Sequence, residues 1–180
     1  MQPSIELEAP DISSYAAGNT GLPYVTCFDS GRPGPHVMVN AVTHGNELCG
    51  AITLDYLFRH DLRPTRGRLT FGFANVEAFL RFTPSRPTAS RYVHEDFNRL
   101  WTPEVLDGPR QSAELTRARE YRPYIDTVDF LLDLQSMQQP SPPLMLAGPL
   151  QTGLALAAGV GIPIHVVADS GHAAGRRLSD

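Results

Sequence analysis

The chain has 180 residues, a net charge of −4 and a hydrophobic content of 42%. This composition is ordinary for a globular protein with a buried core, and the acidic balance gives no electrostatic reason to expect a nucleic-acid partner. All 15 cationic residues are arginine, which excludes a lysine nucleophile or Schiff base.

Two cysteines, Cys27 and Cys49, stand far apart and form no CxxC motif. Such a pair is typical of reduced, intracellular proteins. The N-terminus is acidic and polar, with no signal peptide, and no apolar run approaches the length of a membrane span. We therefore expect a cytoplasmic protein without a membrane partner, and the length predicts one domain over residues 1–180.

The first half of the chain contains three short apolar runs that predict strands at 24–28, 37–42 and 69–74. A turn signal at 30–35 predicts that the first two strands form a hairpin at the edge of the sheet, leading into the central strand. Apolar residues recur at helical spacing in 48–60, which predicts a helix between the second and third strands.

The second half of the chain continues the alternation of strands and helices. The expected elements are a short helix at 76–82, a helix at 109–124, a buried strand within 126–134, a strand at 144–147, a helix at 151–158 and a strand at 162–167. Glu114, Arg117, Arg119 and Glu120 are placed on exposed faces of the 109–124 helix. Strands separated by helices predict an α/β fold with helices on both faces of the sheet.

The segment His44-Gly45-Asn46-Glu47 lies between the predicted central strand and the helix after it. Open α/β sheets bind their ligands at the carboxyl ends of strands. His44 and Glu47 can direct an imidazole and a carboxylate at one ion, a combination that zinc binds, and Gly45 lets the backbone turn. An alternative is a helix cap with a solvated ion pair, because so short a motif needs structural context to confirm it.

Further polar segments follow at spacings that together form a pattern: Asn75 after the third strand, Arg91 seven residues before Asn98, Asp96-Phe97-Asn98-Arg99, Asp133-Leu134-Gln135-Ser136, and Gly171 to Leu178. With the His44–Glu47 segment, this set resembles the succinylglutamate desuccinylase and aspartoacylase family, which is related to the zinc carboxypeptidases. The resemblance implies a three-layer α/β sandwich of the zinc carboxypeptidase type, with a mixed, mostly parallel central sheet.

The resemblance also implies a zinc-dependent hydrolase that removes the acyl group of an N-acyl amino acid or a similar small carboxylate. One Zn²⁺ per chain would bind to His44, Glu47 and the residue at position 135, and a metal-activated water would attack the amide or ester carbonyl. Arg91 matches the arginine that polarises this carbonyl, and Asn98 and Arg99 match the pair that binds the substrate carboxylate.

Each of these assignments has a simpler alternative, because most charged residues lie on protein surfaces. Arg91 would then be one more solvated arginine, and Arg81 and Arg86 are nearby competitors for its role. Asn98 would be a turn former, and Asp96 a helix cap or a partner of a metal ligand. The functional interpretation depends on these residues meeting at the strand ends.

Two features depart from the family pattern. Gln135 stands where the family has a histidine, and a neutral amide is a poor zinc ligand, so we expect weak zinc binding unless His94 or His172 completes the site. The family's general-base glutamate lies on a later strand, and the resemblance ends before it. We therefore expect a domain truncated before the family's C-terminal part, with an open sheet edge that a second copy of the chain, in a homo-oligomer, or another chain would cover.

These departures leave a second interpretation, in which the protein is a binding protein and not an enzyme. The chain would be a catalytically silent relative that binds a small acidic ligand through Arg91, Asn98 and Arg99. Zinc binding with amide hydrolysis would favour the enzyme, and ligand binding without metal would favour the silent relative.

Overall fold

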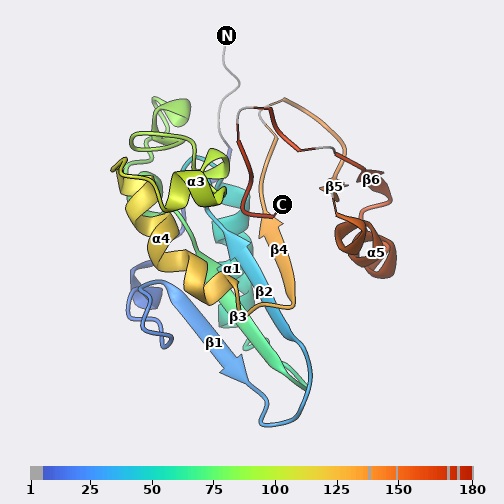
Figure 1. Ribbon diagram of the computed structural model, residues 1–180. Coiled ribbons are helices and arrows are strands. Elements are labelled where there is room, and N and C mark those ends of the chain that lie inside the picture. The colour runs from blue at the N-terminus through green and yellow to red at the C-terminus, as the bar shows by residue number, and fades with distance from the viewer. Residues whose placement is uncertain (1–5, 138, 149, 170, 174, 180) are drawn as a thin grey trace.

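The structure is a computed structural model that describes residues 6–137, 139–148, 150–169, 171–173 and 175–179. Its main feature is a four-stranded sheet (Figure 1). The strands are β1 (Val25–Asp29), β2 (His36–Ala41), β3 (Arg68–Phe73) and β4 (Phe130–Leu134), in the order β1-β3-β2-β4. β2 is parallel to both β3 and β4, and β1 is antiparallel to β3. The predicted α/β fold with a mixed, mostly parallel sheet is confirmed.

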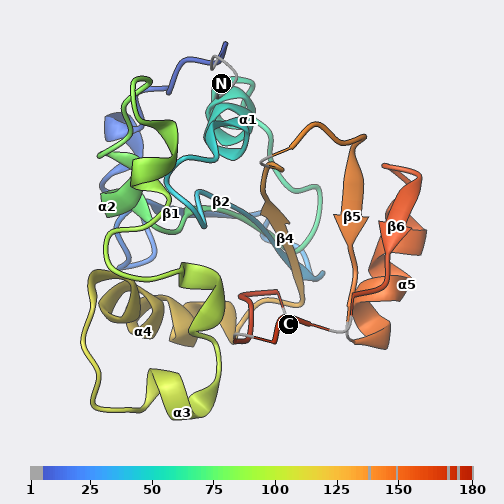
Figure 2. The same ribbon diagram turned by 90° about the horizontal axis from the view of Figure 1, so that it is seen from above.

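Helices cover both faces of this sheet, which gives three layers (Figure 2). On one face lies α1 (Leu48–Arg59), which buries Leu48, Ala51 and Leu54 against the sheet. On the other face lies α4 (Ala113–Ile125), which buries Leu115, Ala118 and Tyr121. In both helices these residues are three apart, so they share one face, and that shared face places each helix on the sheet.

The expected hairpin between the first two strands is wrong. β1 pairs with β3, so that Cys27 lies opposite Thr70, and it does not pair with β2. Both edges of β2 are taken by parallel partners, β3 and β4. Parallel strands are joined by crossover segments, as α1 joins β2 to β3. Because neither edge of β2 is free, β1 pairs with the outer edge of β3.

The expected burial of the 126–134 strand is also wrong. β4 lies at the edge of the sheet, and Phe130 and Leu132 are 43% and 39% exposed. A short apolar run predicts a strand but does not say whether that strand lies at the centre or the edge.

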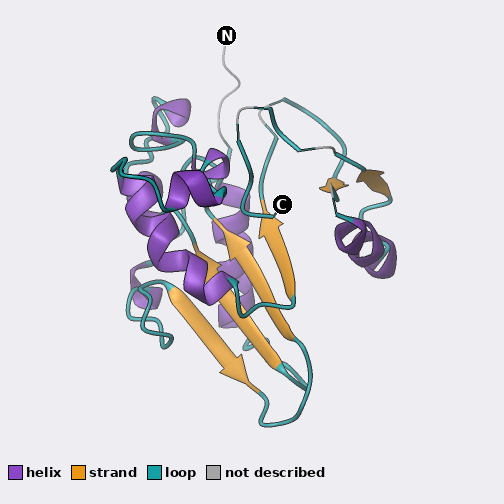
Figure 3. Ribbon diagram, in the orientation of Figure 1, coloured by secondary structure: helices purple, strands orange, loops and turns teal. Residues whose placement is uncertain are grey.

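The remaining elements are short or lie beside the main sheet (Figure 3). They are the helices α2 (Val76–Phe79), α3 (Pro103–Leu106) and α5 (Gln151–Val160), the 3₁₀ helices η1 (Ser13–Tyr15), η2 (Pro87–Ser90) and η3 (Phe97–Arg99), and the strands β5 (Leu144–Leu146) and β6 (His165–Val167). β5 and β6 form a separate two-stranded parallel sheet. Within the described ranges, no helix combines the length and the apolar character needed to cross a bilayer.

His36 at the start of β2 makes the stability of the fold depend on pH. Its buried ring contacts the Thr127 carbonyl oxygen at 3.0 Å and Thr70 Oγ1 at 2.8 Å. Burial lowers the pKa of His36 from its ordinary value, so the unfolded chain binds this proton more readily than the folded chain does. The free energy of unfolding therefore falls as the pH decreases through the ordinary histidine range.

We expect a His36→Gln variant to lose part of this dependence. Urea unfolding between about pH 7.5 and pH 5 should show a weaker pH dependence of the free energy of unfolding for the variant than for the parent. The reason is that glutamine has no proton that the unfolded chain binds more readily than the folded chain. His165→Gln, at an exposed position on β6, is the control and should keep the parental slope. Equal slopes for the parent and His36→Gln would show that His36 does not carry the effect.

Candidate active site

The candidate site lies where the parallel strands end. Residues 44–47 connect β2 to α1, Asn75 follows β3, and 133–136 spans the end of β4. The backbone of Gly45 is closely packed, since a Cβ there would lie 2.3 Å from the Ala78 carbonyl carbon and 2.4 Å from the Ser90 carbonyl oxygen. The tight turn brings His44 and Glu47 against η2 and the loop that follows it, as the position of the motif predicts.

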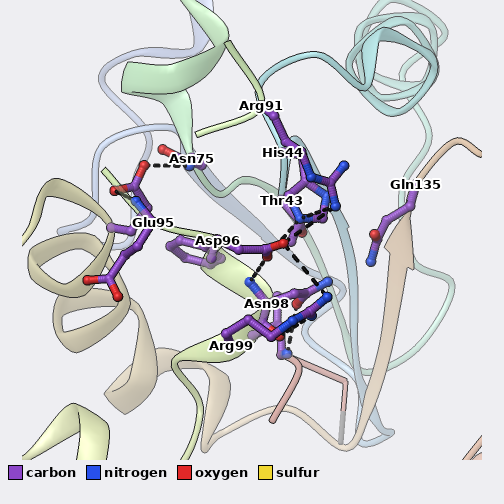
Figure 4. Close-up of polar contacts among 12 residues, drawn as sticks. Thr43, His44, Asn75, Arg91, Glu95, Asp96, Asn98, Arg99 and Gln135 are labelled. Atoms are coloured by element: carbon purple, nitrogen blue, oxygen red, sulfur yellow. Dashed lines mark hydrogen bonds and ion pairs between the residues drawn. The ribbon is translucent and has the colours of Figure 1, made fainter. Parts of the chain in front are cut away.

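His44 lies between two carboxylates, those of Glu47 and Asp96, and the second is labelled beside it in Figure 4. His44 is 2% exposed. Nδ1 is 2.8 Å from Glu47 Oε1, and Nε2 is 3.0 Å from Asp96 Oδ1. Burial lowers the pKa of His44, but the hydrogen bonds to Asp96 and Glu47 outweigh it and raise the pKa above the ordinary value. Metal-binding histidines are commonly held in this way, with a carboxylate orienting the ring from its far side.

Arg91 joins the same cluster. Its Nη1 donates to Glu47 Oε1 at 3.3 Å, and its Nη2 lies 3.0 Å from His44 Nε2 and 3.5 Å from Asp96 Oδ2. Its carbonyl oxygen accepts the Gly45 N–H at 3.1 Å, so backbone and side chain both contact the 44–47 turn. Arg81, the neighbour that could have taken its place, is exposed and pairs with Glu77.

Asp96 connects this cluster to η3. Its Oδ1 accepts the backbone N–H of Asn98 at 2.9 Å, which caps η3, and Arg99 Nη2 lies 3.8 Å from its Oδ2. Burial opposes ionisation, but His44, the Asn98 amide and Arg99 together lower the pKa of Asp96 well below its ordinary value. Asp96 is therefore both a cap and the partner of His44, two roles that the sequence allowed without assigning either.

Asn98 and Arg99 lie next to Asp96 (Figure 4). Asn98 is buried, and its Oδ1 accepts the Leu178 N–H at 3.0 Å, which ties the C-terminal segment to η3. Arg99 Nη1 donates to the Asn98 carbonyl at 2.6 Å, and the Arg99 side chain is 23% exposed. The Arg99 side chain is therefore partly open to solvent.

Gln135 lies across from this cluster at the end of β4 (Figure 4). Its amide donates to Asp133 Oδ2 at 2.7 Å, and Asp133 Oδ1 is held by Asn40 at 2.7 Å and Thr43 at 2.8 Å. The backbone at this point does reach the site, since the next residue, Ser136, donates its N–H to Glu47 Oε2 at 3.4 Å.

The residues match a zinc ion only in part. His44 and Glu47 supply an imidazole and a carboxylate, which zinc binds, but the Gln135 amide points to Asp133. Across the described ranges, no group of three or more His, Cys, Asp and Glu side chains could hold a metal ion. His94 does not complete the set, because its Nδ1 accepts the Ala113 N–H at 3.1 Å. The part of the chain that the structure describes thus offers two zinc ligands, one fewer than the resemblance implies.

Glu114 lies near the site, although the sequence pattern predicts it on an exposed face of the 109–124 helix. This prediction is wrong, because Glu114 is 0% exposed. Its carboxylate accepts backbone N–H groups from the loop that joins Arg91 to Asp96. The position after Ser112, the N-cap of α4, was the available signal, because carboxylates are favoured in the first turn of a helix.

The chain belongs to the succinylglutamate desuccinylase/aspartoacylase family, whose catalytic-domain model matches residues 33–177. A probable aspartoacylase of Parasynechococcus marenigrum (strain WH8102) is 38% identical over 86 residues, which cover 47% of this chain and 26% of that protein. This assignment agrees with the resemblance of the motifs.

Two solved structures share the fold. Murine aminoacylase 3 has a TM-score of 0.59 at 23% sequence identity, and the match covers 83% of this chain and 52% of the aminoacylase chain. The succinylglutamate desuccinylase of Chromobacterium violaceum also has a TM-score of 0.59, at 18% identity, covering 88% and 51%. The chain therefore spans about half the length of these proteins, and the zinc carboxypeptidase-like fold is confirmed.

Proposed function

We propose that the chain carries part of the active site of a deacylase, which cleaves the amide or ester bond of an N-acyl amino acid or a similar small carboxylate. One observation carries the proposal: Arg91 and Arg99 converge on Asp96 beside the buried His44–Glu47 pair. Family membership supports it, because relatives bear the names aspartoacylase and succinylglutamate desuccinylase.

In this proposal Arg99 binds the carboxylate of the substrate. A guanidinium can donate two parallel hydrogen bonds to a carboxylate, and Arg99 is partly open to solvent. Asn98 fixes the backbone that carries Arg99, through the Asp96 cap and the bond from Leu178. Arg91, whose Nη2 lies 3.0 Å from His44 Nε2, would stabilise the negative charge that develops on the carbonyl oxygen under attack.

We further propose Zn²⁺ as the cofactor, with His44 and Glu47 as its ligands from this chain and Asp96 orienting the His44 ring. Zinc, when bound, would activate a water molecule and polarise the substrate carbonyl. Because Gln135 is a weak ligand and points to Asp133, we expect this affinity to be low.

A second candidate is a silent relative that binds a small acidic ligand without turnover. Gln135 favours it, because a neutral amide stands where the family has a histidine ligand and its NH₂ group donates to Asp133. The arginines that would bind the carboxylate are unaffected by this change. The two candidates therefore share the ligand and differ in zinc binding and hydrolysis.

We expect Arg99→Ala to weaken binding of the probe N-acetyl-L-aspartate by about tenfold or more, because the charged hydrogen bonds to its carboxylate are lost. Isothermal titration calorimetry measures the effect. Arg81→Ala, which removes an exposed arginine outside the cluster, should bind like the parent. Equal losses in both variants would contradict a specific role for Arg99.

Hydrolysis assays with added zinc separate the two candidates. Release of acetate from bound probe supports the deacylase, and tight binding without release supports the silent relative. If the parent neither binds nor hydrolyses a panel of N-acyl amino acids, both candidates are wrong.

A further inference from the structure

Glu114 is a buried carboxylate that the proposed reaction does not use. It lies in the first turn of α4 and is completely inaccessible to solvent. Burying an ionised carboxylate is costly unless hydrogen bonds replace its hydration. A buried Glu114 carboxylate therefore requires several hydrogen-bond donors directed at its two oxygens.

Four N–H donors surround these oxygens. Oε1 accepts the Val93 N–H at 2.6 Å and Asn75 Nδ2 at 3.2 Å, and Oε2 accepts the His94 and Glu95 N–H groups at 3.1 and 3.3 Å. The ring Nδ1 of His94, a largely exposed side chain, also lies 4.0 Å from Oε2. Three consecutive backbone amides thus point at one carboxylate, the arrangement by which loops bind anions.

The loop held in this way carries the candidate site. Arg91 stands two residues before Val93, and Asp96 directly follows Glu95. Both ends of the loop contact the 44–47 turn, through the bond from Gly45 N–H to the Arg91 carbonyl and the contact of Asp96 with His44. Glu114 contacts the middle of the loop, and within the part of the chain that the structure describes it makes no hydrogen bond or ion pair with His44 or Arg91.

Asn75, which matches the family pattern, also has its place in this arrangement. It follows β3 and lies on the side of Asp96 away from Gln135 (Figure 4). Its side-chain amide donates to Glu114. Asn75 therefore connects the end of β3, through the Glu114 carboxylate, with the loop that carries Val93–Glu95. Among the hydrogen bonds of the described residues, its side chain contacts Glu114 and makes no direct contact to His44.

We propose that Glu114 is a positioning residue, which holds the Val93–Glu95 amides so that Arg91 and Asp96 meet His44 and Glu47. This inference deepens the proposed function. Its consequence for binding of the substrate carboxylate rests on that proposed function. The arrangement of the loop itself is independent of what the site binds.

The test compares Glu114→Gln with Glu120→Gln. Glutamine offers one acceptor and one NH₂ donor, and the donor would face backbone N–H groups that also donate. Glu120, on the same helix, is exposed and lies 3.8 Å from Arg117, so it controls for a lost charge on α4. Glu114→Asp keeps the charge on a shorter side chain and should fall between the parent and Glu114→Gln.

Two readouts are taken on each variant: backbone amide hydrogen exchange, and calorimetric binding of N-acetyl-L-aspartate. For Glu114→Gln we expect exchange at Val93–Glu95 to rise about tenfold or more, and binding to weaken by a similar factor, with the amides of β2 and β3 unchanged. A purely structural defect would instead raise exchange across the core. Glu120→Gln should match the parent in both readouts.

Parental exchange at Val93–Glu95 in a folded Glu114→Gln variant would overturn the inference. So would faster exchange with unchanged probe binding, because the loop would then not control the site. If the parent neither binds nor hydrolyses any member of the panel of N-acyl amino acids, the proposed function fails, while the exchange data still decide whether Glu114 holds the loop. If Glu114→Gln does not fold, Asn75→Ala, which removes one donor at 3.2 Å, is judged by the same criteria.

Discussion

Replacing Gln135 with histidine is expected to raise the zinc affinity of the chain by at least about 100-fold, because an imidazole is a far better zinc ligand than a neutral amide. The end of β4 already lies close to Glu47, since the Ser136 N–H is 3.4 Å from Glu47 Oε2. Asp133, which now accepts from the Gln135 amide, can accept a ring N–H and orient the new histidine.

Zinc stoichiometry and calorimetry on the dialysed proteins measure this effect. Gln111→His, which adds an imidazole at an exposed position before α4, is the control and should behave like the parent. One tightly bound zinc in the parent would show that another group completes the site and that Gln135 is not limiting. If neither the parent nor Gln135→His binds zinc, His44 and Glu47 are not a metal-binding pair.

Replacing Gly45 with alanine is expected to cost about 3 kcal/mol or more in the free energy of unfolding, because the added Cβ meets backbone that cannot give way easily. The nearest atoms belong to Ala78, Ser90 and Phe79, all between 2.3 and 2.5 Å from the ideal Cβ position. Relief of these contacts would move the 44–47 turn, so His44 would also lose its contacts with Glu47 and Asp96.

Urea unfolding measures the loss, and Gly159→Ala in α5 is the matched control. A Cβ at Gly159 meets nothing within 4 Å, and alanine is the better helix former, so this variant should be neutral or slightly stabilised. Unchanged unfolding midpoints for Gly45→Ala would mean that the turn adapts and that the close packing of Gly45 does not position His44.

Local pattern in the sequence was enough to predict the layers and the place of the site. The spacing of apolar residues in 48–60 predicts α1, and the β-branched run before His44 predicts β2. Because parallel strands present their carboxyl ends at one edge, polar residues that follow β2, β3 and β4 must come close together. The contact of the Ser136 N–H with Glu47 follows from this rule, whereas Arg91 reaches His44 from the loop after η2, which the rule does not cover.

Tertiary structure alone decided which partners these elements take. β1 pairs with β3 because β2 has no free edge, and β4 exposes Phe130 because it pairs on one side only; neither fact is local. Glu114 is buried because a loop 19 to 21 residues earlier in the chain folds over it. Gln135 turns to Asp133 because Asn40 and Thr43 hold that carboxylate in place. Sequence spacing determines which face a side chain occupies, but its partner depends on segments far along the chain that only the folded structure brings together.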